Sequence, residues 1–201
     1  MLLPPTIASL YRTNCVAMVA EALHQRALRR SHEALNNGAL RPLNTDIETW
    51  HGEGDSDFEI RHLVGAPPRH LRTAGPKPNP FLPWDERLEI TGIGDQHVLI
   101  LNKYPVQLGH MLLISRSWQP QVGWLSLQDW TAVCQVNQES TGLWFFNSGP
   151  RAGASQPHRH LQLLPRQIGE RLCPREPWFQ QLLLDGTRTV PGNALQNSIS
   201  I

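Results

Sequence analysis

The sequence predicts an α+β protein, with a mostly antiparallel sheet flanked by helices and a helix at the N-terminal end. Two β-rich runs, residues 96–101 and 110–115, are joined by a loop too short to hold a crossover helix, which favours antiparallel pairing. Helix-favouring and strand-favouring stretches alternate along the rest of the chain. The 201 residues are enough for about one domain with a sizeable core.

The first part of the chain predicts a long helix, a loop, a strand and a connector, in that order. Residues 6–37 hold no proline or glycine and are rich in Ala, Leu, Glu, Gln and Arg, and an Asn-Asn-Gly sequence ends the stretch, so we expect a helix. Residues 41–57 mix Pro, Asn, Asp, Gly and Ser, which predicts a loop, and residues 58–63 predict a short strand. Six prolines and two glycines in residues 65–85 predict an extended connector.

Helices and strands are interleaved after the two central strands. Residues 126–141 predict a helix with Ser126 as its N-cap. Further strands are expected at 143–146 and 158–164, and a short helix at 176–184. Between the two strands, residues 147–157 are rich in Gly, Ser, Ala and Pro, which predicts a loop.

Composition and charge exclude several classes of protein. The 18 basic and 17 acidic residues give a net charge of +1, so no overall field attracts nucleic acid or an anionic membrane, although a nucleotide needs only a few placed cations. No apolar run approaches the length of a membrane span. The three cysteines form no Cys-x-x-Cys pair, and the first residues resemble no export signal. We therefore expect a cytoplasmic protein with no membrane or nucleic-acid partner.

The strongest chemical signal is the sequence His158-Arg159-His160-Leu161-Gln162. Alternate residues of a strand face the same side, so His158, His160 and Gln162 share one face while Leu161 faces the core. The loop before the motif is rich in glycine and serine, and the backbone amides of such a loop can hold an anion. The motif and the loop together therefore form a candidate site.

Three interpretations of this segment are open. It is a strand with a polar solvent face, or His158 and His160 are two ligands of a metal ion, or one histidine is a nucleophile that faces a phosphate held by the loop. The metal interpretation requires a third ligand, and residues 140–169 contain no Asp, Glu or Cys. The residues alone favour the nucleophile and no metal site, but the polar strand and a metal hydrolase using His158 and His160 stay open as alternatives.

The motif is similar to the HxHxQ motif of the histidine-triad superfamily, in its nucleotidyltransferase branch. The longer sequence at 147–162, NSGPRAGASQPHRHLQ, resembles the diadenosine tetraphosphate (Ap4A) phosphorylases, also called ATP adenylyltransferases. KPNPFLP at 77–83 and the segment 99–115, which includes LNKYP and a Gly-His pair, are similar to the same family. Three ordered segments make the resemblance specific, and it covers about residues 10–185.

The resemblance implies phosphorolysis of Ap4A. His160, the second motif histidine, attacks the α-phosphate and ATP departs; inorganic phosphate then takes the adenylyl group to give ADP, and the reverse reaction makes Ap4A from ATP and ADP. A neutral imidazole suits this role, because one ring nitrogen can attack while a backbone carbonyl holds the protonated one. His158 is expected to support His160. Gln162 stands where hydrolase branches have a third histidine, and an amide cannot act as a general acid, which favours transfer over hydrolysis.

The resemblance also implies which residues bind the nucleotide. Lys77 is expected to contact phosphate, with a solvated surface lysine as the equal alternative, and Asn102 is expected to contact ribose or phosphate. The residues expected to wrap the α-phosphate are Asn147, Gly149, Gly153, Ala154, Ser155 and Gln156. Arg151 and Arg159 either neutralise the polyphosphate or are solvated. We expect no tightly bound cofactor, and Mg²⁺ only as a companion of the polyphosphate.

The expected domain organisation also follows from the resemblance. Residues 1–185 are expected to form the N-terminal, histidine-triad-like catalytic domain of an Ap4A phosphorylase, and residues 186–201 an irregular tail. Members of the family have a further C-terminal part that helps to close the nucleotide site, and we expect this sequence to lack it. A second hypothesis is therefore a nucleotide-binding module of the same family with weak catalysis.

Overall fold

The structure is a computed structural model that describes residues 22–51, 57–65, 79–167, 169–173 and 176–184. These residues fall into two compact units, one within 1–45 and 63–170 and the other within 46–62 and 171–201. Residues 6–21 of the helix predicted at 6–37, and most of the connector predicted at 65–85, lie outside the described residues.

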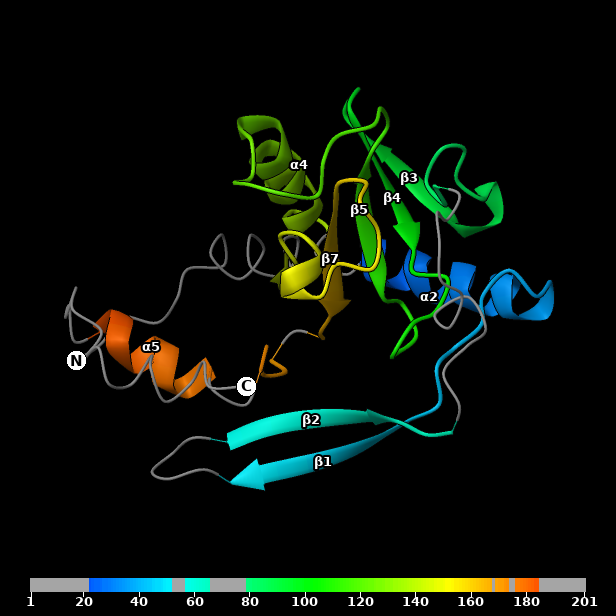
Figure 1. Ribbon diagram of the computed structural model, residues 1–201. Coiled ribbons are helices and arrows are strands. Elements are labelled where there is room, and N and C mark those ends of the chain that lie inside the picture. Colours follow the sequence, from blue (N-terminus) through cyan, green and yellow to red (C-terminus); the bar gives the residue numbers. More distant parts are fainter. Residues whose placement is uncertain (1–21, 52–56, 66–78, 168, 174–175, 185–201) are drawn as a thin grey trace, which may run out of the picture. The chain divides into compact units, whose positions relative to one another are not determined.

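The larger unit is built on a five-stranded sheet with the strand order β3-β4-β5-β7-β6. Figure 1 labels four of these strands, β3, β4, β5 and β7. Each neighbouring pair in this sheet is antiparallel. The strands are β3 (Glu89–Ile93), β4 (His97–Leu101), β5 (Met111–Ser115), β6 (Gly142–Phe145) and β7 (His160–Pro165). The predicted α+β class with a mostly antiparallel sheet is therefore confirmed.

Two helices pack on one face of this sheet. Helix α2 (Ala22–Asn36) contacts β3 and β4, and helix α4 (Leu127–Asn137) contacts β3. Ser126 caps α4 as predicted, and a reciprocal hydrogen bond with Asp129 completes a capping box. The main apolar core lies beneath these helices; its strand residues include Leu99, Leu101, Met111, Leu113, Leu161 and Leu163.

The opposite face of the sheet carries the motif histidines and a smaller apolar cluster. In the strand register, His160 lies opposite Ile114 and Gln162 lies opposite Leu112, so each pair shares this face. Phe81 packs here with Val98, Ile100, Leu112 and Ile114. The alternation that the sequence predicts for the motif is present, with Leu161 on the helix-covered face.

The smaller unit contains a two-stranded sheet and a helix. Strands β1 (Thr45–His51) and β2 (Asp57–Leu63) pair with each other, and the helix is α5 (Glu176–Leu184). The predicted loop at 41–57 is wrong where β1 lies. Residues 45–51 read TDIETWH and are strand-favouring, but nearly every side chain of β1 is exposed, so the strand has no apolar alternation that would reveal it.

The remaining predicted elements agree with the structure to within a few residues. The strands expected at 58–63, 96–101, 110–115, 143–146 and 158–164 are β2, β4, β5, β6 and β7, and the helix expected at 176–184 is α5. No element is predicted where β3 lies, because this edge strand, EITGI, is short and contains a glycine. No helix among the described residues has the length and apolar content to cross a membrane.

Candidate active site

His160 is the first residue of β7, and its ring is held in one orientation. Its Nδ1 lies 2.8 Å from the backbone carbonyl oxygen of His158. A carbonyl only accepts hydrogen bonds, so Nδ1 carries the proton and Nε2 keeps a lone pair. The side chain is buried, and the ring of Phe81 packs against it with centroids 5.4 Å apart. The carbonyl that the imidazole chemistry requires is therefore present, and it belongs to the other motif histidine.

His158 uses both of its ring nitrogens in hydrogen bonds. Its Nε2 lies 2.8 Å from the carbonyl oxygen of Ser115, to which it donates, and 3.0 Å from the hydroxyl of the same residue. Its Nδ1 accepts from the side-chain amide of Asn79 at 2.9 Å. The Asn79 oxygen accepts from the backbone N–H of Phe81, which fixes the orientation of that amide. His158 thus has no free lone pair for attack, and its carbonyl serves His160.

Burial keeps the histidines of this face neutral. It lowers the pKa of both His158 and His160, although hydrogen bonds to Ser115 and His158 act in the opposite direction. A third buried histidine, His110, has its pKa lowered to about 4 by burial, against the hydrogen bond to Gln162 that raises it. At neutral pH the Nε2 lone pair of His160 is consequently available to an electrophile.

We expect these depressed pKa values to make the fold sensitive to acid. Between pH 6.5 and about 4 the unfolded chain binds a proton at His110 that the folded chain does not, so the stability present above pH 6.5 is lost as the pH falls through this window. The loss from His110 amounts to about 3 kcal/mol. Urea unfolding at pH 7, 5.5 and 4.5 measures it, and His110→Phe should flatten the dependence. If the free energy of unfolding of His110→Phe fell with pH as steeply as that of the unmodified chain, the prediction would be contradicted.

Gln121, which the sequence did not point to, holds the backbone of His160 from a neighbouring loop. Its side-chain oxygen accepts from the His160 N–H at 2.7 Å. Its amide donates to the His160 carbonyl at 2.9 Å and to the Asn147 carbonyl at 3.1 Å. One buried carboxamide therefore joins the candidate nucleophile to the start of the 147–157 loop.

Replacing Gln121 by leucine is expected to cost about 2–3 kcal/mol of unfolding free energy, because the buried N–H of His160 is left without its partner. Urea denaturation measures this loss. Gln128→Leu is the matched control, since Gln128 is exposed on α4 and the same change there should stay within about 0.5 kcal/mol. Equal effects of the two changes would show that the hydrogen bonds of Gln121 add little.

The loop 147–157 carries several predicted substrate-binding residues, and it is tied to the backbone of His160 at Asn147 through Gln121. It contains a short 3₁₀ turn, Pro150–Ala152, flanked by Gly149 and Gly153 with φ of 85° and 86°, values that favour glycine. The amides of Gly149, Gly153 and Ala154 bond to carbonyls within the loop. In the described part of the chain the backbone amides of Ser155 and Gln156 make no hydrogen bond to protein, so both N–H groups are open to solvent or to a ligand.

Gln162 lies on the same face of β7 as His160 and contacts His110. The Gln162 oxygen is 3.0 Å from Nε2 of His110, and Asn102 contacts the other ring nitrogen of His110 at 3.4 Å. The predicted residues Gln162 and Asn102 thus belong to one row of polar side chains, joined by a histidine that the sequence did not single out. The Gly-His pair in the family-like segment 99–115 was the available signal.

Arg159 is neither a polyphosphate contact nor a solvated side chain. It projects to the helix-covered face, because it alternates with His158 and His160 along the chain. Its guanidinium donates to the carbonyls of Pro120, Val122 and Trp124. It also pairs with the buried carboxylate of Asp129 at 2.9 Å, which His97 contacts at 3.0 Å on its other oxygen. Arg159 therefore holds the loop that carries Gln121.

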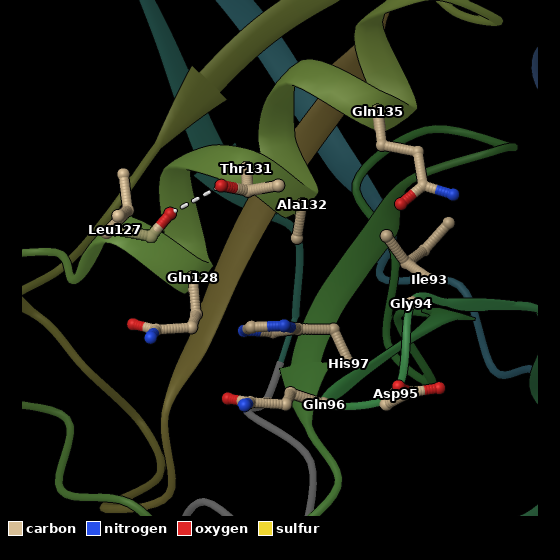
Figure 2. Close-up of a pocket in the computed structure, with 10 residues that line it drawn as sticks. All are labelled: Ile93, Gly94, Asp95, Gln96, His97, Leu127, Gln128, Thr131, Ala132 and Gln135. Carbon is tan, nitrogen blue, oxygen red and sulfur yellow. Dashed lines mark hydrogen bonds between the residues drawn. The ribbon is translucent and has the colours of Figure 1, made fainter.

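Figure 2 shows a separate pocket of about 310 Å³, which the candidate site residues do not line. It lies between α4 and the turn that joins β3 to β4. Gln128, Thr131 and Gln135 line it from the helix, and Asp95 and His97 from the turn and β4. No lysine or arginine is among its lining residues, and Asp95 contributes a carboxylate, so it does not offer the cations that a polyphosphate requires.

Three further predictions concern a metal, Lys77 and Arg151. In the parts of the chain that the structure describes, no three His, Cys, Asp or Glu side chains are grouped as metal ligands would be. Lys77 lies outside the described residues. Arg151 is exposed on the 3₁₀ turn of the loop.

Comparisons with known proteins identify the family to which this chain is similar. Residues 13–181 match the family model for the Ap4A phosphorylase N-terminal domain. The chain is 32% identical over 123 residues to diadenosine 5′,5‴-P1,P4-tetraphosphate phosphorylase 2 of Saccharomyces cerevisiae, covering 54% of this chain and 36% of that protein. It is 30% identical over 168 residues to protein APA1 of the same yeast, covering 76% of this chain and 50% of that protein.

A solved structure shares the fold. The crystal structure of yeast Ap4A phosphorylase Apa2 in complex with AMP superposes with a TM-score of 0.63 at 26% identity, over 84% of this chain and 57% of that chain. The antiparallel sheet and its buried HxHxQ strand define a protein of the histidine-triad superfamily. Within it, this chain belongs to the Ap4A phosphorylase N-terminal domain family. The chain spans half or less of the length of the two curated relatives.

Proposed function

We propose that this chain is a nucleotidyltransferase that phosphorolyses Ap4A, giving ADP and ATP, through an adenylyl group carried on His160. The observation that supports this most is the hydrogen bond from Nδ1 of His160 to the His158 carbonyl, which leaves Nε2 as a neutral nucleophile in a buried site. The relatives support the substrate class, since one is named an Ap4A phosphorylase and the Apa2 structure holds AMP.

The proposed reaction has two displacements at the same phosphorus. In the first, Nε2 of His160 attacks the α-phosphorus of Ap4A, the bond to the bridging oxygen breaks, and ATP leaves with the bond's electrons. In the second, an oxygen of inorganic phosphate attacks the adenylyl phosphorus, the P–N bond breaks, and ADP leaves a neutral His160. Each step exchanges one bond for another, and the reverse sequence makes Ap4A from ATP and ADP.

The surrounding residues have proposed roles in binding. The amides of Ser155 and Gln156 and the carboxamide of Gln162 donate to oxygens of the α-phosphate. Asn102 and Asn147 flank the site and contact ribose or phosphate, and Lys77 contributes charge to the polyphosphate. The glycines of the 147–157 loop and Ala154 let the backbone approach the phosphate closely.

The expected partners are inorganic phosphate and the small nucleotides Ap4A, ATP and ADP. The expected location of the protein is the cytoplasm. The two cysteines in the described residues, Cys134 and Cys173, are both free thiols, which supports a reducing compartment.

Incubation of the purified chain with Ap4A, with and without inorganic phosphate, tests this proposal. Separation of the nucleotides by chromatography should show ADP and ATP in equal amounts, and only when phosphate is present. Bound nucleotide without products would reject phosphorolysis by this chain and support a nucleotide-binding module. Release of AMP without phosphate would instead indicate a hydrolase.

A further inference from the structure

A row of hydrogen bonds runs from the loop after β4 to Gln162. The backbone N–H of Tyr104 donates to the side-chain oxygen of Asn102 at 3.0 Å. The side-chain nitrogen of Asn102 lies 3.4 Å from Nδ1 of His110. On the other side of the ring, Nε2 of His110 lies 3.0 Å from the side-chain oxygen of Gln162. His110 is thus the link between two of the predicted site residues.

The direction of each bond in this row follows from the first one. A backbone N–H can only donate, so the atom of Asn102 that it contacts is the oxygen, and the atom that faces His110 is the NH₂ group. That group also only donates, so Nδ1 of His110 must be unprotonated. A neutral imidazole then has its proton on Nε2, which donates to Gln162. The partner atom of Gln162 is therefore its oxygen.

The neutral state of His110 is secured by its surroundings. Its side chain is buried, and the ring of Phe145, the residue opposite Gln162 in the strand register, lies 6.4 Å from it. The lowered pKa of His110 agrees with a ring that holds a single proton at neutral pH. No second tautomer fits, because a proton on Nδ1 would face the NH₂ group of Asn102.

We propose that His110 is a positioning residue for Gln162: it binds the carboxamide oxygen and thereby turns the amide NH₂ toward the substrate phosphate. In the described part of the chain no partner is recorded for that NH₂ group, so it is free to donate. A carboxamide turned the other way would present its oxygen to an anionic phosphate, which is repulsive. The inference rests on the proposed function, since it names the group that holds the α-phosphate donor.

Two substitutions at His110 distinguish the effect of its hydrogen-bond donor from the effect of its buried ring. His110→Phe keeps a buried ring and removes both nitrogens, so the Gln162 amide is no longer fixed. His110→Gln places a side-chain N–H within reach of the Gln162 oxygen. We expect His110→Phe to lower kcat for Ap4A phosphorolysis about 10- to 100-fold, and His110→Gln to restore most of it.

The same substitutions in a Gln162→Ala background distinguish positioning from a structural role. If His110 acts through Gln162, His110→Phe should have no further effect on kcat once Gln162 is absent. The affinity for AMP should follow the same pattern when it is measured by calorimetry in the unmodified chain, His110→Phe, Gln162→Ala and the variant that combines His110→Phe with Gln162→Ala. An equal loss in both backgrounds would overturn the inference, because it would show that His110 supports the fold and not the amide.

A spectroscopic measurement separates this inference from the proposed function. In ¹⁵N-labelled full chain, the His110 ring should show a protonated Nε2 and an unprotonated Nδ1, and His110→Phe should move the Gln162 side-chain amide signal. A protonated Nδ1 would overturn the inference even in an active enzyme. The unmodified chain could make no ADP or ATP and still show the predicted His110 tautomer, with AMP affinities of the variants as expected. That result would reject only the proposed reaction and leave the inference about His110 standing.

Discussion

Replacing His160 by asparagine is expected to lower Ap4A phosphorolysis by more than about a thousandfold. The asparagine amide can still donate to the His158 carbonyl, as Nδ1 of His160 does at 2.8 Å, so the fold should persist. It has no atom with the reactivity of the Nε2 lone pair, so the adenylyl group has no acceptor. The measurement is intact-mass spectrometry after incubation with Ap4A in the absence of phosphate, where the unmodified chain should gain the mass of one adenylyl group and His160→Asn should not.

Two controls make this result specific. His62→Ala changes an exposed histidine of β2 and should leave both the adduct and the phosphorolysis unchanged. Urea unfolding of His160→Asn should lie within about 1 kcal/mol of the unmodified chain, which excludes misfolding as the reason for inactivity. An adduct that still forms in His160→Asn would place the nucleophile at another residue.

Asp129→Ala is expected to be the most destabilising single change, at about 3–5 kcal/mol. Burial by itself would raise the pKa of Asp129, but hydrogen bonds from His97, Ser126 and Arg159 outweigh it and lower the pKa, so the carboxylate is charged. Its removal leaves the Arg159 guanidinium buried without its counter-charge and removes one half of the capping box of α4. Urea denaturation at pH 7 measures the loss.

Asp46→Ala is the matched control, because Asp46 is an exposed carboxylate on β1 and its loss should change the free energy of unfolding by less than about 0.5 kcal/mol. Asp129→Asn should fall between the two, since it keeps the size of the side chain and loses its charge. A loss of under 1 kcal/mol in Asp129→Ala would mean that Arg159 finds other partners, contrary to the buried geometry.

The central strands and the orientation of the motif could be predicted from sequence because they depend on local periodicity. A period of two places His158, His160 and Gln162 on one face, and the structure has them there. The same period puts Arg159 on the other face, which argues against a phosphate contact without any structure. Strand β1 could not be found this way, because its exposed side chains carry no apolar alternation.

The residues that support the site could not be predicted, because their contacts join distant parts of the chain. Asn79 is 79 positions from His158, and Gln121 is 39 positions from His160. Such side-chain hydrogen bonds leave no periodic trace in the sequence. Asn79 and His110 lay within family-like segments, whereas Gln121 had no signal at all. Local pattern thus indicates which residues react, and tertiary contacts decide which residues hold them.

The two faces of β7 make this strand intolerant of changes in length. Inserting or deleting one residue within His160–Pro165 would exchange the faces of everything that follows, moving Gln162 into the apolar core and Leu161 or Leu163 onto the polar face. The loop 147–157 has no such alternation to preserve. For the fold of this region, a change in length is therefore better tolerated in the loop than within β7, where it would alter the spacing between His160 and Gln162.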